Sequence, residues 1–133
     1  MVNKIERLAR RLMPSHEPQS CAEPPQMPTR RERIEAMLAD EPRDVFLRYS
    51  LALELEKEGD HERSLAGLRD LMADSPPNVP ACFRAGQQLT QLGRLAEART
   101  ALRAGIEAAR TQGDSHAAGE MSEFLTSLGP LGE

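Results

Sequence analysis

The side chains of this chain that could ligate a soft metal or act as strong nucleophiles are three histidines and two cysteines. A zinc-type site needs donors at C-x-x-C or H-x-x-x-H spacing, which brings two of them onto one turn. No two of these residues have that spacing, so the sequence predicts no metal site and no cofactor. We expect solvated His61 and His116, a packed Cys82 thiol and an exposed Cys21 thiol. The five residues are His16, Cys21, His61, Cys82 and His116.

Motifs for covalent and phosphate chemistry are also missing from the sequence. It contains no G-x-G-x-x-G and no G-K-[ST] loop, and no nucleophile stands beside a recognisable base. Catalysis needs a positioned acid or base in a dry cleft, and nothing in the sequence marks one. The sequence therefore predicts a protein that is not an enzyme.

The composition favours helices and an acidic body. Aromatic residues make up only 3% of the chain, whereas strands favour aromatic and β-branched side chains. Residues 1–33 hold seven Lys/Arg against four Asp/Glu, and residues 34–133 hold ten against seventeen. The body is thus acidic, which disfavours nucleic acid as a partner. Without a disulfide pattern or an apolar run of about 18 residues, we expect a cytoplasmic protein.

The N-terminal part divides into two segments before the main body. Residues 1–13 predict a basic amphipathic helix, because Ile5, Leu8 and Leu12 share one stripe. Residues 14–28 contain five of the ten prolines and predict a flexible linker of about 45 Å when extended. Residues 29–133 form the predicted helical domain. Its expected helices begin after Thr29 and span about 30–41, 44–57, 61–73, 80–92, 95–111 and 114–128.

A period of 34 residues runs through this domain. Shifting the sequence by 34 places aligns Leu55 with Leu89 and Leu68 with Leu102, and the segment 33–42 aligns with 67–76. Such a period indicates antiparallel helix pairs that stack into one continuous core.

These repeats resemble the tetratricopeptide repeat (TPR) family. The resemblance covers about residues 30–112, as units 45–78 and 79–112 plus one half-unit, and 114–128 would be a capping helix. It implies an all-α, short TPR-like solenoid with a tethered N-terminal amphipathic helix. Arg48 and Cys82 depart from the family, which often has a large aromatic residue there. The matching residues are the small pairs Leu51–Ala52 and Ala85–Gly86, the turn glycines Gly59 and Gly93, small Ser64 and Ala98, and Pro42 and Pro76.

In this family the first helix of each unit lines a concave face. The resemblance therefore implies a partner-binding wall with apolar pockets and orienting polar groups. The alternative is that Phe46 and Phe83 pack between adjacent units. Only Lys57 and Arg84 lie near this wall as cations, so a carboxylate clamp is not predicted. The predicted partner-binding residues are Phe46, Tyr49, Leu53, Glu56, Phe83, Gln87 and Thr90.

The resulting hypothesis is a non-catalytic module that binds a peptide or protein segment. Two alternatives stay open. One is a peripheral adaptor whose residues 2–13 dock on an anionic membrane or on nucleic acid. The other is a structural subunit whose N-terminal helix completes the solenoid in cis or across a homodimer, because an isolated helix of twelve residues is marginal in water. The sequence identifies neither the partner nor the oligomeric state.

Overall fold

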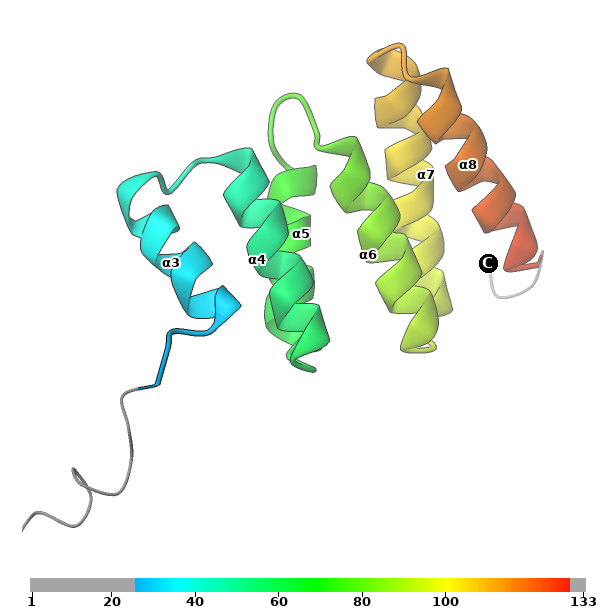
Figure 1. Ribbon diagram of the computed structural model, residues 1–133. Coiled ribbons are helices and arrows are strands. Elements are labelled where there is room, and N and C mark those ends of the chain that lie inside the picture. Colours follow the sequence, from blue (N-terminus) through cyan, green and yellow to red (C-terminus); the bar gives the residue numbers. More distant parts are fainter. Residues whose placement is uncertain (1–25, 130–133) are drawn as a thin grey trace, which may run out of the picture.

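The computed structural model describes residues 26–129, which fold into six α-helices and no strand. The helices lie side by side in chain order, and consecutive helices run in roughly opposite directions (Figure 1). The predicted helix 2–13 and most of its linker lie outside the described residues. The helices are α3 (Arg30–Asp40), α4 (Val45–Lys57), α5 (His61–Met72), α6 (Val79–Gln91), α7 (Leu95–Thr111) and α8 (Ser115–Ser127).

Side-chain caps fix where most of these helices begin. Thr29 and Glu32 form a capping box at the start of α3, in which the Thr29 Oγ1 accepts from the Glu32 backbone N–H at 3.1 Å. An Asp or Asn side chain accepts from the first turn of α4, α5, α6 and α8. The connections after α4, α6 and α7 contain Gly59, Gly93 and Gly113, each with φ between 77° and 85°. Glycine adopts this left-handed conformation without a steric penalty, so the predicted turns at Gly59 and Gly93 are confirmed.

Small residues let the two helices of each unit approach closely, as the family pattern predicts. Ser64 is fully buried, and its hydroxyl donates to the carbonyl oxygen of Ala52 at 2.6 Å. In the next unit a Cβ atom on Gly86 would lie only 2.6 Å from a methyl group of Leu102. The antiparallel pairs α4–α5 and α6–α7 therefore form two tightly packed hairpins.

Stacking of the hairpins gives a continuous core. One cluster joins Leu65, Leu68 and Leu71 of α5 to the inner face of α6. A second joins Leu102 of α7 to Met121 of α8, and Met72 and Leu128 contact both clusters. The all-α, TPR-like solenoid is thus confirmed, and α8 packs at its C-terminal end.

The two departures from the family pattern have separate structural roles. The Arg48 guanidinium donates to both oxygens of Asp74, at 2.8 and 3.2 Å, and so ties α4 to the segment that follows α5. This pairing holds the pKa of the Asp74 carboxyl below its usual range. Cys82 is buried between α6 and α7, as predicted, and burial raises the pKa of its thiol.

Candidate functional site

The seven residues predicted to bind a partner lie on the first helices of the two units. We call them together the first-helix face; they are Phe46, Tyr49, Leu53 and Glu56 on α4 and Phe83, Gln87 and Thr90 on α6. Spacings of three and four residues bring the members of each helix onto one side of it. The two helices are equivalent members of successive units, so their faces belong to one surface.

Apolar groups are unevenly accessible on this face. Phe46 lies in the first turn of α4 and is 75% exposed, the most exposed large hydrophobic residue of the six helices. Tyr49 is half-buried and packs against the core, and burial raises the pKa of its phenol. Leu53 is also half-buried. The α4 part of the face therefore offers one free aromatic ring beside two fixed apolar side chains.

Phe83 is engaged by the next helix. Its ring meets that of Phe124 on α8 edge to face, with centroids 5.9 Å apart and planes at 68°. Phe83 remains half-buried, so this aromatic pair joins α6 to α8. The sequence did not indicate this pairing.

The polar residues of the face differ in whether their side chains are already engaged in hydrogen bonds. Glu56 accepts from the Nε and Nη2 atoms of Arg84 at 2.9 and 2.8 Å, which links α4 to α6. The Thr90 hydroxyl donates to the Gly86 carbonyl of its own helix at 2.8 Å. The half-buried Gln87 amide makes no hydrogen bond with any residue of 26–129. Arg84 and Gln87 are thus the polar groups best placed to meet a ligand.

Behind the face lies a buried polar network that the sequence did not reveal. Gln88 is fully buried; its Oε1 lies 3.2 Å from the Ser64 hydroxyl oxygen, and its Nε2 lies 3.0 Å from the Nδ1 atom of His61. His61 is therefore a half-buried, hydrogen-bonded residue, and the prediction that it is solvated was wrong. His116 is exposed as predicted, 3.0 Å from Glu120.

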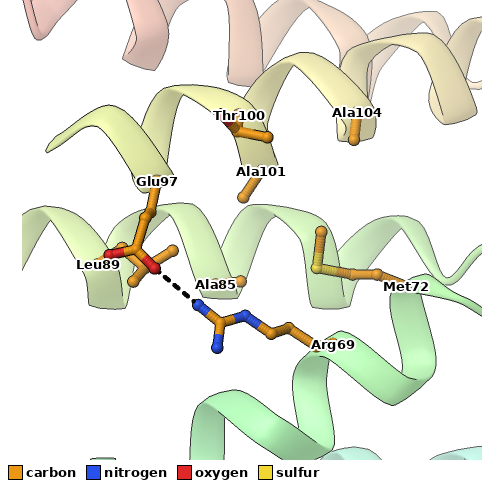
Figure 2. A pocket seen from close by; sticks show the side chains of 8 residues that line it. All are labelled: Arg69, Met72, Ala85, Leu89, Glu97, Thr100, Ala101 and Ala104. Atoms are coloured by element: carbon orange, nitrogen blue, oxygen red, sulfur yellow. Dashed lines mark hydrogen bonds and ion pairs between the residues drawn. The ribbon is translucent and has the colours of Figure 1, made fainter. Parts of the chain in front are cut away.

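A separate hollow opens between α5, α6 and α7, and none of the seven predicted residues lines it. Its volume is about 260 Å³, and its floor is apolar (Figure 2). At one edge the Arg69 Nη2 atom lies 3.0 Å from Glu97, joining α5 to α7 (Figure 2). We call this site the second-helix hollow. It is lined by Arg69, Met72, Ala85, Leu89, Glu97, Thr100, Ala101 and Ala104.

Two other kinds of site are absent from the described part of the chain. Residues 26–129 contain no group of three or more His, Cys, Asp or Glu side chains arranged to hold a metal ion. None of the six helices described is long and apolar enough to cross a membrane.

Comparison with known proteins places this architecture in a family, although no protein-family model matches the chain. The chain is 33% identical over 97 residues to a TPR repeat-containing protein of Pseudomonas aeruginosa, covering 73% of this chain and 92% of the relative. The solution structure of a tetratricopeptide repeat domain protein from Salinibacter ruber is 29% identical, with a TM-score of 0.63 over 69% of this chain and 93% of that one. A Bordetella parapertussis protein is 31% identical, with a TM-score of 0.65 over 77% and 89% of the two chains. The chain therefore belongs to the tetratricopeptide repeat family.

Proposed function

We propose that this protein is a non-catalytic interaction module whose first-helix face binds an extended or helical segment of a protein partner. Family membership supports the general class, because TPR proteins typically act as non-catalytic scaffolds for protein interactions. The main support for this face is the 75% exposure of the Phe46 side chain. Exposed aromatic side chains are common anchors in interfaces.

The surroundings of Phe46 suit a peptide. Tyr49 and Leu53 provide apolar contact area farther along α4. The Gln87 amide on α6, which has no hydrogen-bond partner within residues 26–129, can orient a peptide backbone by hydrogen bonding. Arg84 is 39% exposed although it pairs with Glu56, so it can also meet an acidic group of the ligand. Two and a half units provide a small contact area, so we expect a transient interaction with a Kd near the micromolar range, about 1–100 μM.

A peptide library displayed on phage provides a probe for this proposal without a known partner. The full-length chain is panned, and the Kd of each enriched peptide is measured by fluorescence anisotropy. The double variant Phe46→Ala, Tyr49→Ala should weaken binding at least tenfold, because it removes both aromatic anchors of α4. Phe83 is left intact in this test, since its replacement would also remove the contact with Phe124.

The second-helix hollow provides the matched control. Ala104 is exposed and lines that hollow, so Ala104→Glu places a charge there without touching the first-helix face. We expect this variant to bind the selected peptides as tightly as the parent. Binding that is lost in Ala104→Glu and kept in the double variant would contradict the proposal and assign the hollow instead.

A further inference from the structure

Helix α3 is the second helix of a repeat whose first helix is missing from residues 26–129. The 34-residue register aligns Ile34 of α3 with Leu68 of α5, and Met37 with Leu71. Leu71 is fully buried, whereas Met37 is 49% exposed. Both α3 and α5 are followed in the chain by the first helix of the next repeat, so that neighbour does not account for the difference. What α5 has and α3 lacks is a first helix of its own, which for α5 is α4. Met37 is therefore exposed at the place where the first helix of its repeat would pack.

The sequence of the directly preceding residues is poorly suited to a helix at that position. In the 34-residue register, the first helix of this unit would span about residues 11–23. This stretch contains Pro14 and Pro18, and a proline inside a helix costs about 3 kcal/mol or more. A helix that covers Met37 must therefore come from elsewhere.

Phe46 lies at the same end of the solenoid. Met37 and Phe46 are in the two helical turns that flank the connection between α3 and α4, and both are exposed. Asp40 and Glu41 between them are also exposed, and neither makes an ion pair within residues 26–129. This end of the molecule thus combines uncovered apolar side chains with unpaired carboxylates. We call it the α3–α4 end.

We propose that residues 2–13 of the same chain cover Met37 at the α3–α4 end and act as the N-terminal cap of the solenoid. The stripe of Ile5, Leu8 and Leu12 supplies the apolar contacts for Met37, and the nearby Phe46 ring stays with the first-helix face. The segment carries four basic residues against one glutamate, which complements Asp40 and Glu41. Its twelve residues would form a helix of about 18 Å, which matches the eleven residues of α3.

The linker permits this placement within one chain. Residues 14–28 reach about 45 Å when extended, more than twice the length of α3, and so allow either direction of the docked helix. The cap does not reproduce the close helix crossing of the later repeats. Arg30 stands where they have the buried Ser64 and Ala98, and it extends to Glu54 at 2.9 Å. The capping helix therefore lies toward the carboxyl end of α3, over Met37.

Paramagnetic relaxation in the full-length chain tests this placement without any partner, so its outcome is independent of the peptide-binding test. A nitroxide is attached at Asn3→Cys in a Cys21→Ser background; the Cys82 thiol is buried and leaves the new cysteine as the reactive one. The amide signals of Met37 and Phe46 should lose most of their intensity, while those of α7 and α8 should keep theirs. Equal loss over the whole body, or no loss at the α3–α4 end, would overturn the proposal.

Two controls separate the alternatives. The variant Leu8→Asp should restore the lost intensities, because it places a charge in the apolar stripe, whereas Leu8→Met should leave the broadening in place. A mixture of nitroxide-labelled protein without ¹⁵N and ¹⁵N-labelled protein without nitroxide should show no broadening. Broadening at Met37 in that mixture would place the segment on a second copy and overturn the cap within one chain.

Discussion

Arg99 is a buried cation on α7. It is 2% exposed and stands one repeat after the fully buried Leu65. Its Nη2 atom donates to the carbonyl oxygens of Leu128 and Gly129, at 3.0 and 3.2 Å, while Nε and Nη1 have no hydrogen-bond partner among residues 26–129. Arg99 thus holds the end of α8 against α7 and leaves part of its own charge unsatisfied.

This arrangement predicts different outcomes for two substitutions of Arg99. Arg99→Met keeps much of the side-chain volume and removes the buried charge, so the free energy of unfolding should change by less than about 1 kcal/mol. Arg99→Ala also removes the charge but leaves a cavity, and should cost about 2–4 kcal/mol. Urea unfolding of both variants measures the difference. If Arg99→Met were as destabilising as Arg99→Ala, the hydrogen bonds to α8 would outweigh the packing.

Tyr49 is the single tyrosine of the chain, which also has no tryptophan, so its phenol can be titrated by absorbance without interference. Burial raises its pKa, and the folded protein should ionise Tyr49 above the ordinary value of about 10. The unfolded chain then loses its proton first, so this residue's contribution to stability is complete below about pH 10 and is lost as the pH rises further. The chain unfolded in urea is the control. An equal midpoint in both states would mean that the phenol is freely solvated.

Close packing between helices limits which side chains fit at their contacts, and Gly105 shows this most directly. A Cβ atom there would lie 2.5 Å from the Met121 sulfur on α8 and 2.6 Å from the Cβ of Cys82 on α6. Gly105→Ala should therefore destabilise the fold by about 1–3 kcal/mol through overpacking. Gly119 on α8 has open space around it, so Gly119→Ala should instead stabilise by about 0.5–1 kcal/mol. Thermal unfolding compares the two, and equal shifts would show that α7 and α8 are less closely packed than described.

The helices themselves could be predicted from the sequence because their signals are local. Capping side chains, the glycines after α4 and α6 and the leucine spacing all act within a few residues. The contacts between helices could not be predicted in the same way. Glu56 and Arg84 are 28 residues apart, and Phe83 and Phe124 are 41 apart. Such pairs depend on how each helix is rotated about its own axis. That rotation changes with small differences in the loops between the helices.

The same limit explains the errors and omissions at the candidate site. Sequence spacing placed the seven residues of the first-helix face on two equivalent helices, but it could not distinguish the free Phe46 from the engaged Phe83. It also treated His61 as solvated because the residue follows a turn. Its ring nitrogen instead lies beside Gln88, which belongs to the next unit. The second-helix hollow could not be predicted from the sequence, because it forms only where three helices pack together.

The molecule as a whole is a short solenoid with two distinct surfaces and one unfilled end. Its first-helix face carries the exposed Phe46 ring and the half-buried Gln87 amide, whereas the second-helix hollow is an apolar depression on α5, α6 and α7. Because each repeat contacts only its neighbours, a partner that spans α4 and α6 would bridge both hairpins. A partner on the first-helix face and a partner in the second-helix hollow would therefore contact different residues.

Chemical-shift mapping of a selected library peptide on the ¹⁵N-labelled full-length chain tests the binding surface most directly. If the first-helix face binds the peptide, the largest shifts should fall on the amides of Phe46, Tyr49 and Gln87 and of their neighbours on α4 and α6. The amides around Thr100 and Ala104 should move little. Shifts concentrated on Arg69, Thr100 and Ala104, with α4 unaffected, would contradict the account.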